Sequence, residues 1–108
     1  MNTLLEKLNG LVARFEEVST LITDPSVIAD QQRYVRLTKE YKELEDLMTA
    51  RKEYADLLSN LEESKDLLLN ETDPEMKEMA REEVVNCEKR IPELEESIKL
   101  MLVPKDPE

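Results

Sequence analysis

The chain has 108 residues, of which 40% are hydrophobic and 38% are charged, with a single glycine and no tryptophan. This length suits one domain, and the composition favours long amphipathic helices and excludes sandwiches and barrels, which need more glycine and β-branched residues. The net charge of -11, from 26 acidic and 15 basic residues, would repel a phosphate backbone unless the basic groups gathered on one face.

The first predicted helix covers residues 3–23, where apolar side chains recur at alternating steps of four and three and therefore share one stripe. These side chains are Leu4, Leu8, Leu11, Phe15, Val18 and Ile22. Thr3 and Glu6 have the spacing of a capping box at its start. Gly10 lies inside the helix and is interpreted as a point where a neighbouring element approaches closely. Pro25 ends the helix, because the residue before a proline is pushed out of helical geometry.

The second predicted helix, residues 31–70, contains no glycine or proline, and Asp30 offers its N-cap. Its apolar stripe shifts by about one residue between the two halves, which indicates a change of packing partner. The stripe consists of Tyr34, Leu37, Tyr41, Leu44 and Met48, followed by Tyr54, Leu58, Leu61 and Leu68. We expect the tyrosines at the edges of the core, with their hydroxyl groups in water.

The third predicted helix covers residues 74–102, with Asp73 as N-cap and Pro74 at the first helical position. Steps of four and three again produce a coiled-coil seam. The seam comprises Ala80, Val84, Cys87, Ile91, Leu94, Ile98 and Met101. Pro92 removes one backbone hydrogen bond, at a cost of about 3 kcal/mol. Because the seam continues past Pro92, we expect one bent helix rather than two, with Cys87 in the core.

Short connectors between these helices force consecutive helices to lie antiparallel. The predicted fold is therefore all-α, an elongated antiparallel three-helix bundle or coiled coil in which residues 51–83 form a two-helix hairpin with its tip at 70–74. Residues 1–103 would form the helical bundle domain, and residues 104–108, with two prolines, would begin a linker. We expect a monomer. The methionines are expected to fill the core: Met48, Met76, Met79 and Met101.

The sequence offers little for catalysis, because it has no histidine, the commonest general base and zinc ligand. Adjacent carboxylates such as Glu62 and Glu63 diverge by about 100° on a helix, and Asp24, Asp30 and Asp73 are explained as helix caps. We therefore predict no catalytic, cofactor-binding or metal-binding residue and no enzymatic activity, and the sequence does not identify which residues bind partners.

The location is predicted to be cytoplasmic and not membrane-bound. Cys87 is the only cysteine, which excludes an intramolecular disulfide, and no apolar run suits a signal peptide or a membrane span. Lysine and arginine alternate with glutamate, as in Lys-Glu-Tyr-Lys-Glu at residues 39–43, which is typical of solvated helix faces with i to i+4 pairs. Direct binding of DNA or RNA is therefore not expected.

Three short strings resemble one protein family. Residues 21–30, Leu-Ile-Thr-Asp-Pro-Ser-Val-Ile-Ala-Asp, resemble the connector between the first two helices of bacterial class-1 peptide chain release factors. The run from Tyr34 to Tyr41 and the string Leu-Met-Leu-Val-Pro-Lys-Asp-Pro at 100–107 are similar to two further segments of that family, the second being its exit into the next domain. The resemblance is to the amino-terminal domain of the type that reads UAA and UAG.

This resemblance implies a helical interaction module in translation termination on the ribosome. The family's codon-reading Pro-X-Thr motif and catalytic Gly-Gly-Gln motif have no counterpart in the sequence, so no catalytic residue is carried over. The implied partners are the ribosome at the GTPase-associated region of its large subunit, the companion release-factor GTPase and the release-factor glutamine methyltransferase.

Two alternatives remain open from the residues themselves. The tRNA-binding helical arm of a seryl-tRNA synthetase has a similar length, but its tip should be basic, whereas residues 62–75 are mainly acidic. A free-standing structural coiled-coil adaptor would dimerise through its seam, but the irregular stripe of the second helix favours internal pairing.

Overall fold

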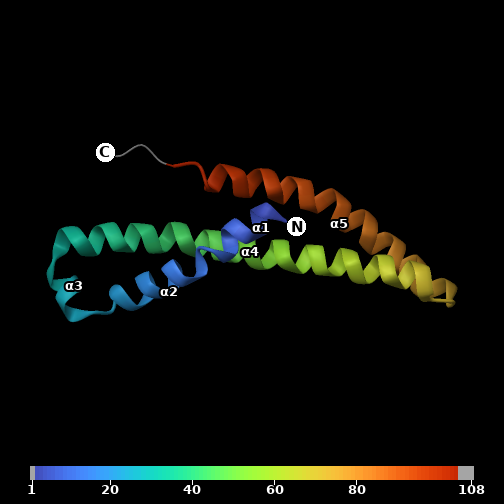
Figure 1. The fold of residues 1–108 in the computed structure, drawn as a ribbon, viewed down its shortest axis with the longest axis horizontal. Coiled ribbons are helices and arrows are strands. Elements are labelled where there is room, and N and C mark those ends of the chain that lie inside the picture. The colour runs from blue at the N-terminus through green and yellow to red at the C-terminus, as the bar shows by residue number, and fades with distance from the viewer. Residues whose placement is uncertain (1, 105–108) are drawn as a thin grey trace. The chain divides into compact units, whose positions relative to one another are not determined.

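The computed structural model describes residues 2–104, and every regular element within that range is a helix (Figure 1). The order is α1 (Thr3–Asn9), α2 (Val12–Leu21), α3 (Pro25–Ala29), α4 (Gln31–Asn70) and α5 (Pro74–Met101). The predicted all-α class is confirmed. The chain divides into two compact units, Met1–Arg51 and Lys52–Glu108. The first unit contains α1, α2, α3 and residues 31–51 of α4, and the second contains residues 52–70 of α4 together with α5.

The predicted single helix over residues 3–23 is wrong, because α1 ends at Asn9 and α2 begins at Val12. The interruption lies at Gly10 and Leu11, where glycine, a poor helix former, weakens the helix. A Cβ atom on Gly10 would meet only the carbonyl oxygens of Lys7 and Glu6, at 3.4 and 3.6 Å. The expected close approach of another element at Gly10 is therefore also wrong.

The helix starts follow the predicted caps with one exception. Asn2, and not Thr3, caps α1, since its Oδ1 accepts a 2.9 Å hydrogen bond from the amide of Leu5. Asp24 accepts a bond from the amide of Ser26 at 2.8 Å at the start of α3, and Asp30 accepts one from the amide of Arg33 at 3.2 Å. Caps placed before a proline or before a long helix were thus predictable.

In the first unit, α2 runs alongside the amino-terminal half of α4 (Figure 1). The rings of Phe15 and Tyr41 stack with centroids 5.3 Å apart, and Arg51 Nε donates to Asn9 Oδ1 at 2.7 Å. The buried apolar side chains of this unit come from all four of its helices: Leu8, Val18, Val27, Leu37, Leu44, Leu47 and Ala50. One small core therefore holds these helices together.

In the second unit, α4 and α5 form an antiparallel hairpin joined by residues 71–73, as predicted (Figure 1). Asp73 caps α5 by accepting from the amide of Glu75 at 3.0 Å. The predicted position of Tyr54 at the core edge is wrong, because this residue is fully buried and its hydroxyl donates to Glu95 Oε2 at 2.7 Å. A buried tyrosine hydroxyl needs such an acceptor.

The predicted seam of α5 is buried at Ala80, Cys87, Leu94 and Ile98. The prediction that the methionines fill the core is wrong for Met76, Met79 and Met101, which are 44%, 70% and 37% exposed. The reason is geometric, since a pair of helices buries one narrow stripe on each helix and leaves residues beside that stripe in water.

Pro92 does not divide the third predicted helix, and α5 is continuous from Pro74 to Met101 as expected. Pro92 and Glu88, whose carbonyl loses its usual partner, both lie on the exposed side of α5, where water can bond that carbonyl. Of the predicted linker at residues 104–108, Pro104 is outside any helix, and residues 105–108 lie outside the described residues.

Candidate interaction surfaces

Residues 2–104 contain no group of three or more histidine, cysteine, aspartate or glutamate side chains able to hold a metal ion. None of the helices in that range combines the length and the apolar character needed to cross a membrane. Cys87 is buried, and its Sγ lies 3.5 Å from Glu83 Oε1. Burial, followed by the nearby Glu83 carboxylate, raises the pKa of the Cys87 thiol, so this group stays protonated at neutral pH and is a poor nucleophile.

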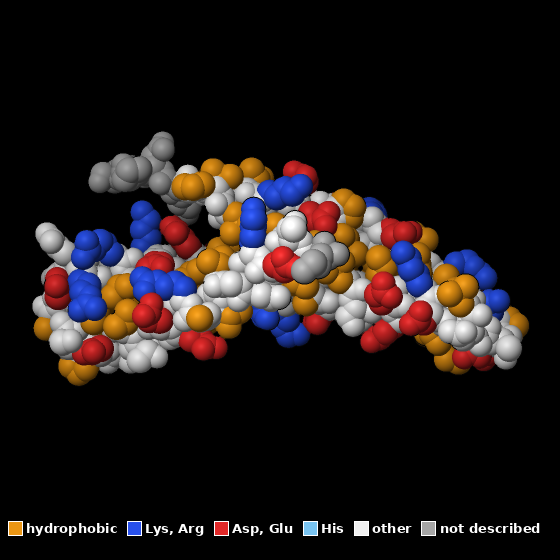
Figure 2. All heavy atoms as spheres, in the orientation of Figure 1, with side chains coloured by type: hydrophobic (Ala, Val, Ile, Leu, Met, Phe, Trp, Pro, Cys, Tyr) orange, Lys and Arg blue, Asp and Glu red, His pale blue; other side chains and the backbone are white. Residues whose placement is uncertain are grey.

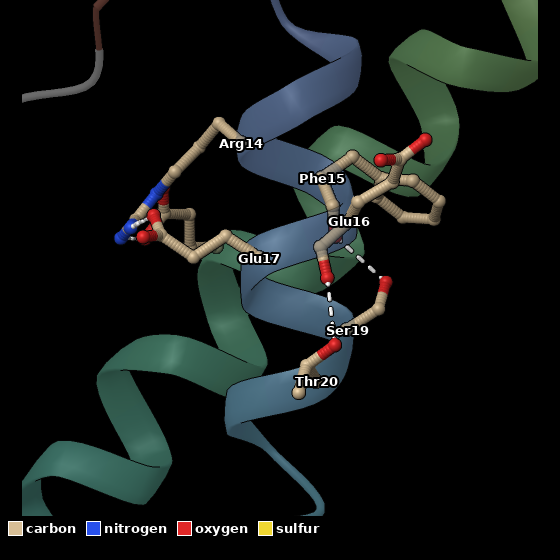
Figure 3. Close-up of polar contacts among 7 residues, drawn as sticks. Arg14, Phe15, Glu16, Glu17, Ser19 and Thr20 are labelled. Carbon is tan, nitrogen blue, oxygen red and sulfur yellow. Dashed lines mark hydrogen bonds and ion pairs between the residues drawn. The ribbon is translucent and has the colours of Figure 1, made fainter.

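An interhelical ion pair joins α2 to α4 in the first unit. Arg14 Nε and Nη2 donate to the two carboxylate oxygens of Glu40 at 2.6 and 2.7 Å, and Arg14 also pairs with Glu17. Figure 3 shows Arg14 and Glu17 directed toward one another on α2. The hydrogen bond from Arg14 lowers the pKa of Glu40, and that of Arg14 is raised in return. Both oxygens of the Glu40 carboxylate are therefore occupied by hydrogen bonds from Arg14 of α2.

Four exposed basic side chains follow one another at three-residue intervals along the start of α4. We call them the basic surface: Arg33, Arg36, Lys39 and Lys42. Between residues 31 and 42 the only acidic residue is Glu40, and within residues 2–104 none of the four basic groups forms an ion pair. Figure 2 shows several lysine and arginine side chains at the left of the view, with acidic side chains between them.

A shallow hollow lies beside the basic surface. It has a volume of about 370 Å³ and is lined by Gln31, Gln32, Val35 and Arg36. Val35 is 58% exposed, and Ile28 of α3 is 51% exposed. The surface of the hollow is mainly apolar, and its lining residues include no carboxylate. Gln31, Gln32 and Arg36 are themselves exposed.

The second unit is much more acidic than the first. Residues 52–104 hold 15 acidic and 7 basic residues, a net charge of −8, whereas residues 2–51 hold 9 acidic and 7 basic residues, a net charge of −2. Seven exposed carboxylates flank the hairpin turn, and we call them the acidic surface: Glu62, Glu63, Asp66, Asp73, Glu75, Glu78 and Glu82. Leu69 and Met79, 82% and 70% exposed, lie among them in the sequence.

Two polar contacts join α4 to α5 at positions far from the hairpin turn. Tyr54 bonds Glu95, and Arg90 Nε and Nη2 donate to the carboxylate of Glu53 at 2.8 and 3.2 Å. The hydrogen bond from Arg90 lowers the pKa of Glu53. Neither contact uses a carboxylate of the acidic surface, and the only ion pair made by its members within residues 2–104 is that of Glu78 with Arg81. Apart from Glu78 and from Asp73, which caps α5, the carboxylates of the acidic surface are therefore available to a partner.

Comparison with known proteins identifies the family. The model of the PCRF domain matches residues 11–108. The chain belongs to the PCRF domain family. It is 71% identical over 107 residues to peptide chain release factor 1 of Bacteroides fragilis, covering 99% of the chain and 29% of that relative. The corresponding factor of Bacteroides thetaiotaomicron is 69% identical over the same coverage. No solved structure gives a significant match.

These matches confirm the resemblance inferred from the three strings, and they do not favour the seryl-tRNA synthetase arm or the free-standing adaptor. The chain spans about three tenths of the length of the relatives it matches, as the 30% coverage of the Lactobacillus helveticus release factor also shows, at 50% identity. Sequence reasoning missed the basic surface. The signal was the absence of any acidic residue from 31 to 39.

Proposed function

We propose that this chain is the amino-terminal helical domain of a peptide chain release factor, of the type that reads UAA and UAG, and that it acts in translation termination on the ribosome. The single observation that carries this proposal is the 71% identity to Bacteroides fragilis peptide chain release factor 1 over 107 residues. In this role the domain is an interaction module in the cytoplasm, and peptide release is performed by parts of the factor outside these residues.

The proposed partners are the GTPase-associated region of the large ribosomal subunit, the companion release-factor GTPase and the release-factor glutamine methyltransferase. The support from the structure is chemical. The described residues present charged helix faces, while the buried Cys87 and the capping aspartates Asp24, Asp30 and Asp73 are already used for packing and for helix starts. Such faces suit protein contact, since charge complementarity accelerates and orients association.

We assign the acidic surface of the second unit to contact with basic ribosomal protein. Its carboxylates are exposed, and Leu69 and Met79 add apolar area that a protein partner can bury. A phosphate backbone is a poor partner for a unit with a net charge of −8 over residues 52–104. This assignment concerns the second unit alone.

A chimeric factor tests the assignment. The 107 matched residues of Bacteroides fragilis peptide chain release factor 1 are replaced by this chain, and Glu62, Glu63 and Glu78 are then changed to lysine. We expect the kcat/KM of release at UAA to fall roughly tenfold at low salt and by less at high salt, because exposed charges are screened. Release that is unchanged at both salt concentrations would show that the acidic surface is not used.

The proposed role itself makes a prediction about the gene. The reading frame beyond the codon for Glu108 should continue through a Pro-X-Thr motif and a Gly-Gly-Gln motif. A continuing frame with both motifs supports a release factor. A frame that runs on without either motif, or that stops at once, would contradict the termination role, whatever the charged surfaces bind.

A further inference from the structure

The strongest feature not used by the proposed function is the basic surface of α4. A chain with a net charge of −11 contains nine consecutive residues, 31–39, with three basic groups and no acidic group. Arg33, Arg36, Lys39 and Lys42 are all exposed. Charges of one sign placed side by side on a helix repel one another, so a helix gains nothing from this arrangement by itself. The arrangement gains free energy when an anion is bound.

The spacing sets the form of this surface. Residues three apart on a helix are neighbours, with Cβ atoms about 5–6 Å apart, and each step of three turns the helix by about 300°. The four basic groups therefore follow one another along a strip that winds around the solvent side of α4. A strip of evenly spaced cations on a rigid rod fits a chain of evenly spaced anions better than it fits one compact anion.

The packing of α2 fixes the strip in place and occupies one neighbouring carboxylate. Glu40 would otherwise lie within reach of this strip, but both of its oxygens accept from Arg14 at 2.6 and 2.7 Å. The stacked rings of Phe15 and Tyr41 hold the same two helices together one residue further along each. The basic groups therefore lie on a helix that is held by packing, and the carboxylate of Glu40 is already occupied. Other carboxylates, Asp30, Glu43 and Asp46, lie three or four residues away from members of the strip.

Two exposed glutamines beside the hollow add hydrogen-bonding groups of a different kind. Gln31 and Gln32 supply amide donors and acceptors next to Arg36. A ribose 2′-hydroxyl is both a donor and an acceptor, and it is the group by which a protein distinguishes RNA from DNA. Arginine also binds phosphate oxygens in a bidentate manner, which lysine cannot do. The two glutamine amides and the strip together match a phosphate backbone that carries 2′-hydroxyl groups.

We propose that the basic surface and its hollow bind the backbone of an RNA helix. The choice of RNA over DNA or an anionic membrane rests on the proposed ribosomal function, whereas the choice of a polyanion rests on the charges alone. This inference replaces the expectation, drawn from the alternation of lysine and glutamate, that the chain does not touch RNA.

The test is direct binding of a fluorescent RNA duplex of about 20 base pairs to the 108-residue chain, followed by anisotropy at two salt concentrations. If four phosphates are contacted, the affinity should fall roughly 100-fold between about 50 and 200 mM salt. A duplex of DNA with the same sequence should bind more weakly. Circular dichroism confirms that each variant keeps its helices.

Two matched variants locate the binding. In the first, Arg36, Lys39 and Lys42 are changed to glutamate; in the second, the exposed Lys52, Lys65 and Lys89 of the other unit are changed to glutamate. Both variants lower the net charge equally. We expect the first to lose at least tenfold in RNA affinity relative to the second, with a shallower dependence on salt.

An equal loss in both variants would overturn the proposal, because it would show attraction to net charge alone. DNA bound as tightly as RNA would overturn the assignment to RNA. So would binding to phosphatidylserine vesicles that depends on the same three residues and is tighter than binding to the duplex. A failure here leaves the proposed function standing, because the reading frame beyond Glu108 and release by the chimera are measured without reference to RNA affinity.

Discussion

Both units of this chain pair their helices in the same way, but they differ in surface charge. The first joins α2 to α4 through Arg14 and Glu40, and the second joins α4 to α5 through Arg90 and Glu53. Each thus uses one arginine and one glutamate across a helix pair. The charges left over differ, being −2 in total over residues 2–51 with a separate basic surface, and −8 over residues 52–104.

The comparison shows that the packing of the helices and the charge of their exposed faces are independent of each other. Both partners of each interhelical pair are partly exposed, and such pairs contribute little to stability. Apolar burial holds each unit, through seven buried side chains in the first and through Tyr54 and the α5 seam in the second. The exposed charges are therefore not needed for packing and can serve to bind partners. The two units present different exposed charges.

The largest expected effect concerns the core of the second unit. Changing Tyr54 to alanine removes a fully buried ring and should lower the free energy of unfolding by about 3–5 kcal/mol. Changing Tyr34, a partly exposed tyrosine of the first unit, should lower it by about 0.5 kcal/mol or less. Urea denaturation of both variants measures the difference. Equal losses would break the contrast between a buried and an exposed tyrosine.

The seam of α5 makes a prediction about thiol chemistry. Cys87 is buried with a raised thiol pKa, so its reaction with a disulfide reagent at neutral pH should be at least about 100-fold slower in the native protein than in urea. The control places the thiol at the exposed position of the same helix, by combining Cys87→Ala with Met79→Cys. That variant should react at nearly the same rate in both states. Fast native labelling of Cys87 would contradict its burial.

The hydrogen bond between Tyr54 and Glu95 should contribute less than the ring itself. Changing Tyr54 to phenylalanine keeps the ring and removes the donor, and should cost about 1 kcal/mol. A double-mutant cycle with Glu95→Ala, which removes the acceptor, isolates the pair, with an expected coupling of about 1 kcal/mol. Strict additivity of the two changes would show that the hydroxyl and the carboxylate do not interact in solution.

The smallest expected effect is the pH dependence of the two arginine pairs. Arg14 and Arg90 lower the pKa values of Glu40 and Glu53 below the usual 4.5, so the stability each pair contributes is present above that pH and is lost as the pH falls through the lower folded value. Glu40→Gln and Glu53→Gln should each reduce slightly the fall in Tm between about pH 5 and pH 3. A steeper fall of Tm in either variant would contradict the predicted sign of the pH dependence.

Much of the fold could be predicted from residue spacing. The limits of the long helix, residues 31–70, and the start at Pro74 follow from glycine and proline positions and from capping aspartates, and the structure has helices with those limits. The interruption at Gly10 could not be predicted, because the apolar stripe runs through it without a break and only the weak helix propensity of glycine marks the site.

The candidate surfaces were harder to predict. The alternation of lysine and glutamate at residues 39–43 predicts a solvated face with i to i+4 pairs, but the structure gives both oxygens of Glu40 to Arg14, 26 positions away. Met79 illustrates the opposite error, since its spacing beside the seam suits a core in a thick bundle but leaves it exposed on a two-helix hairpin. Both errors come from contacts that are distant in sequence, which periodicity does not record.

The most direct test of the central claim uses the chimeric factor without any charge change. The claim is that this chain is the interaction domain of a release factor, so Bacteroides fragilis peptide chain release factor 1 carrying this chain in place of its own 107 matched residues should release peptide at UAA and UAG. We expect a kcat/KM within about threefold of the unaltered factor, since most of the matched residues are the same. A folded chimera that binds ribosomes poorly and loses release by a factor of about 100 would contradict the claim.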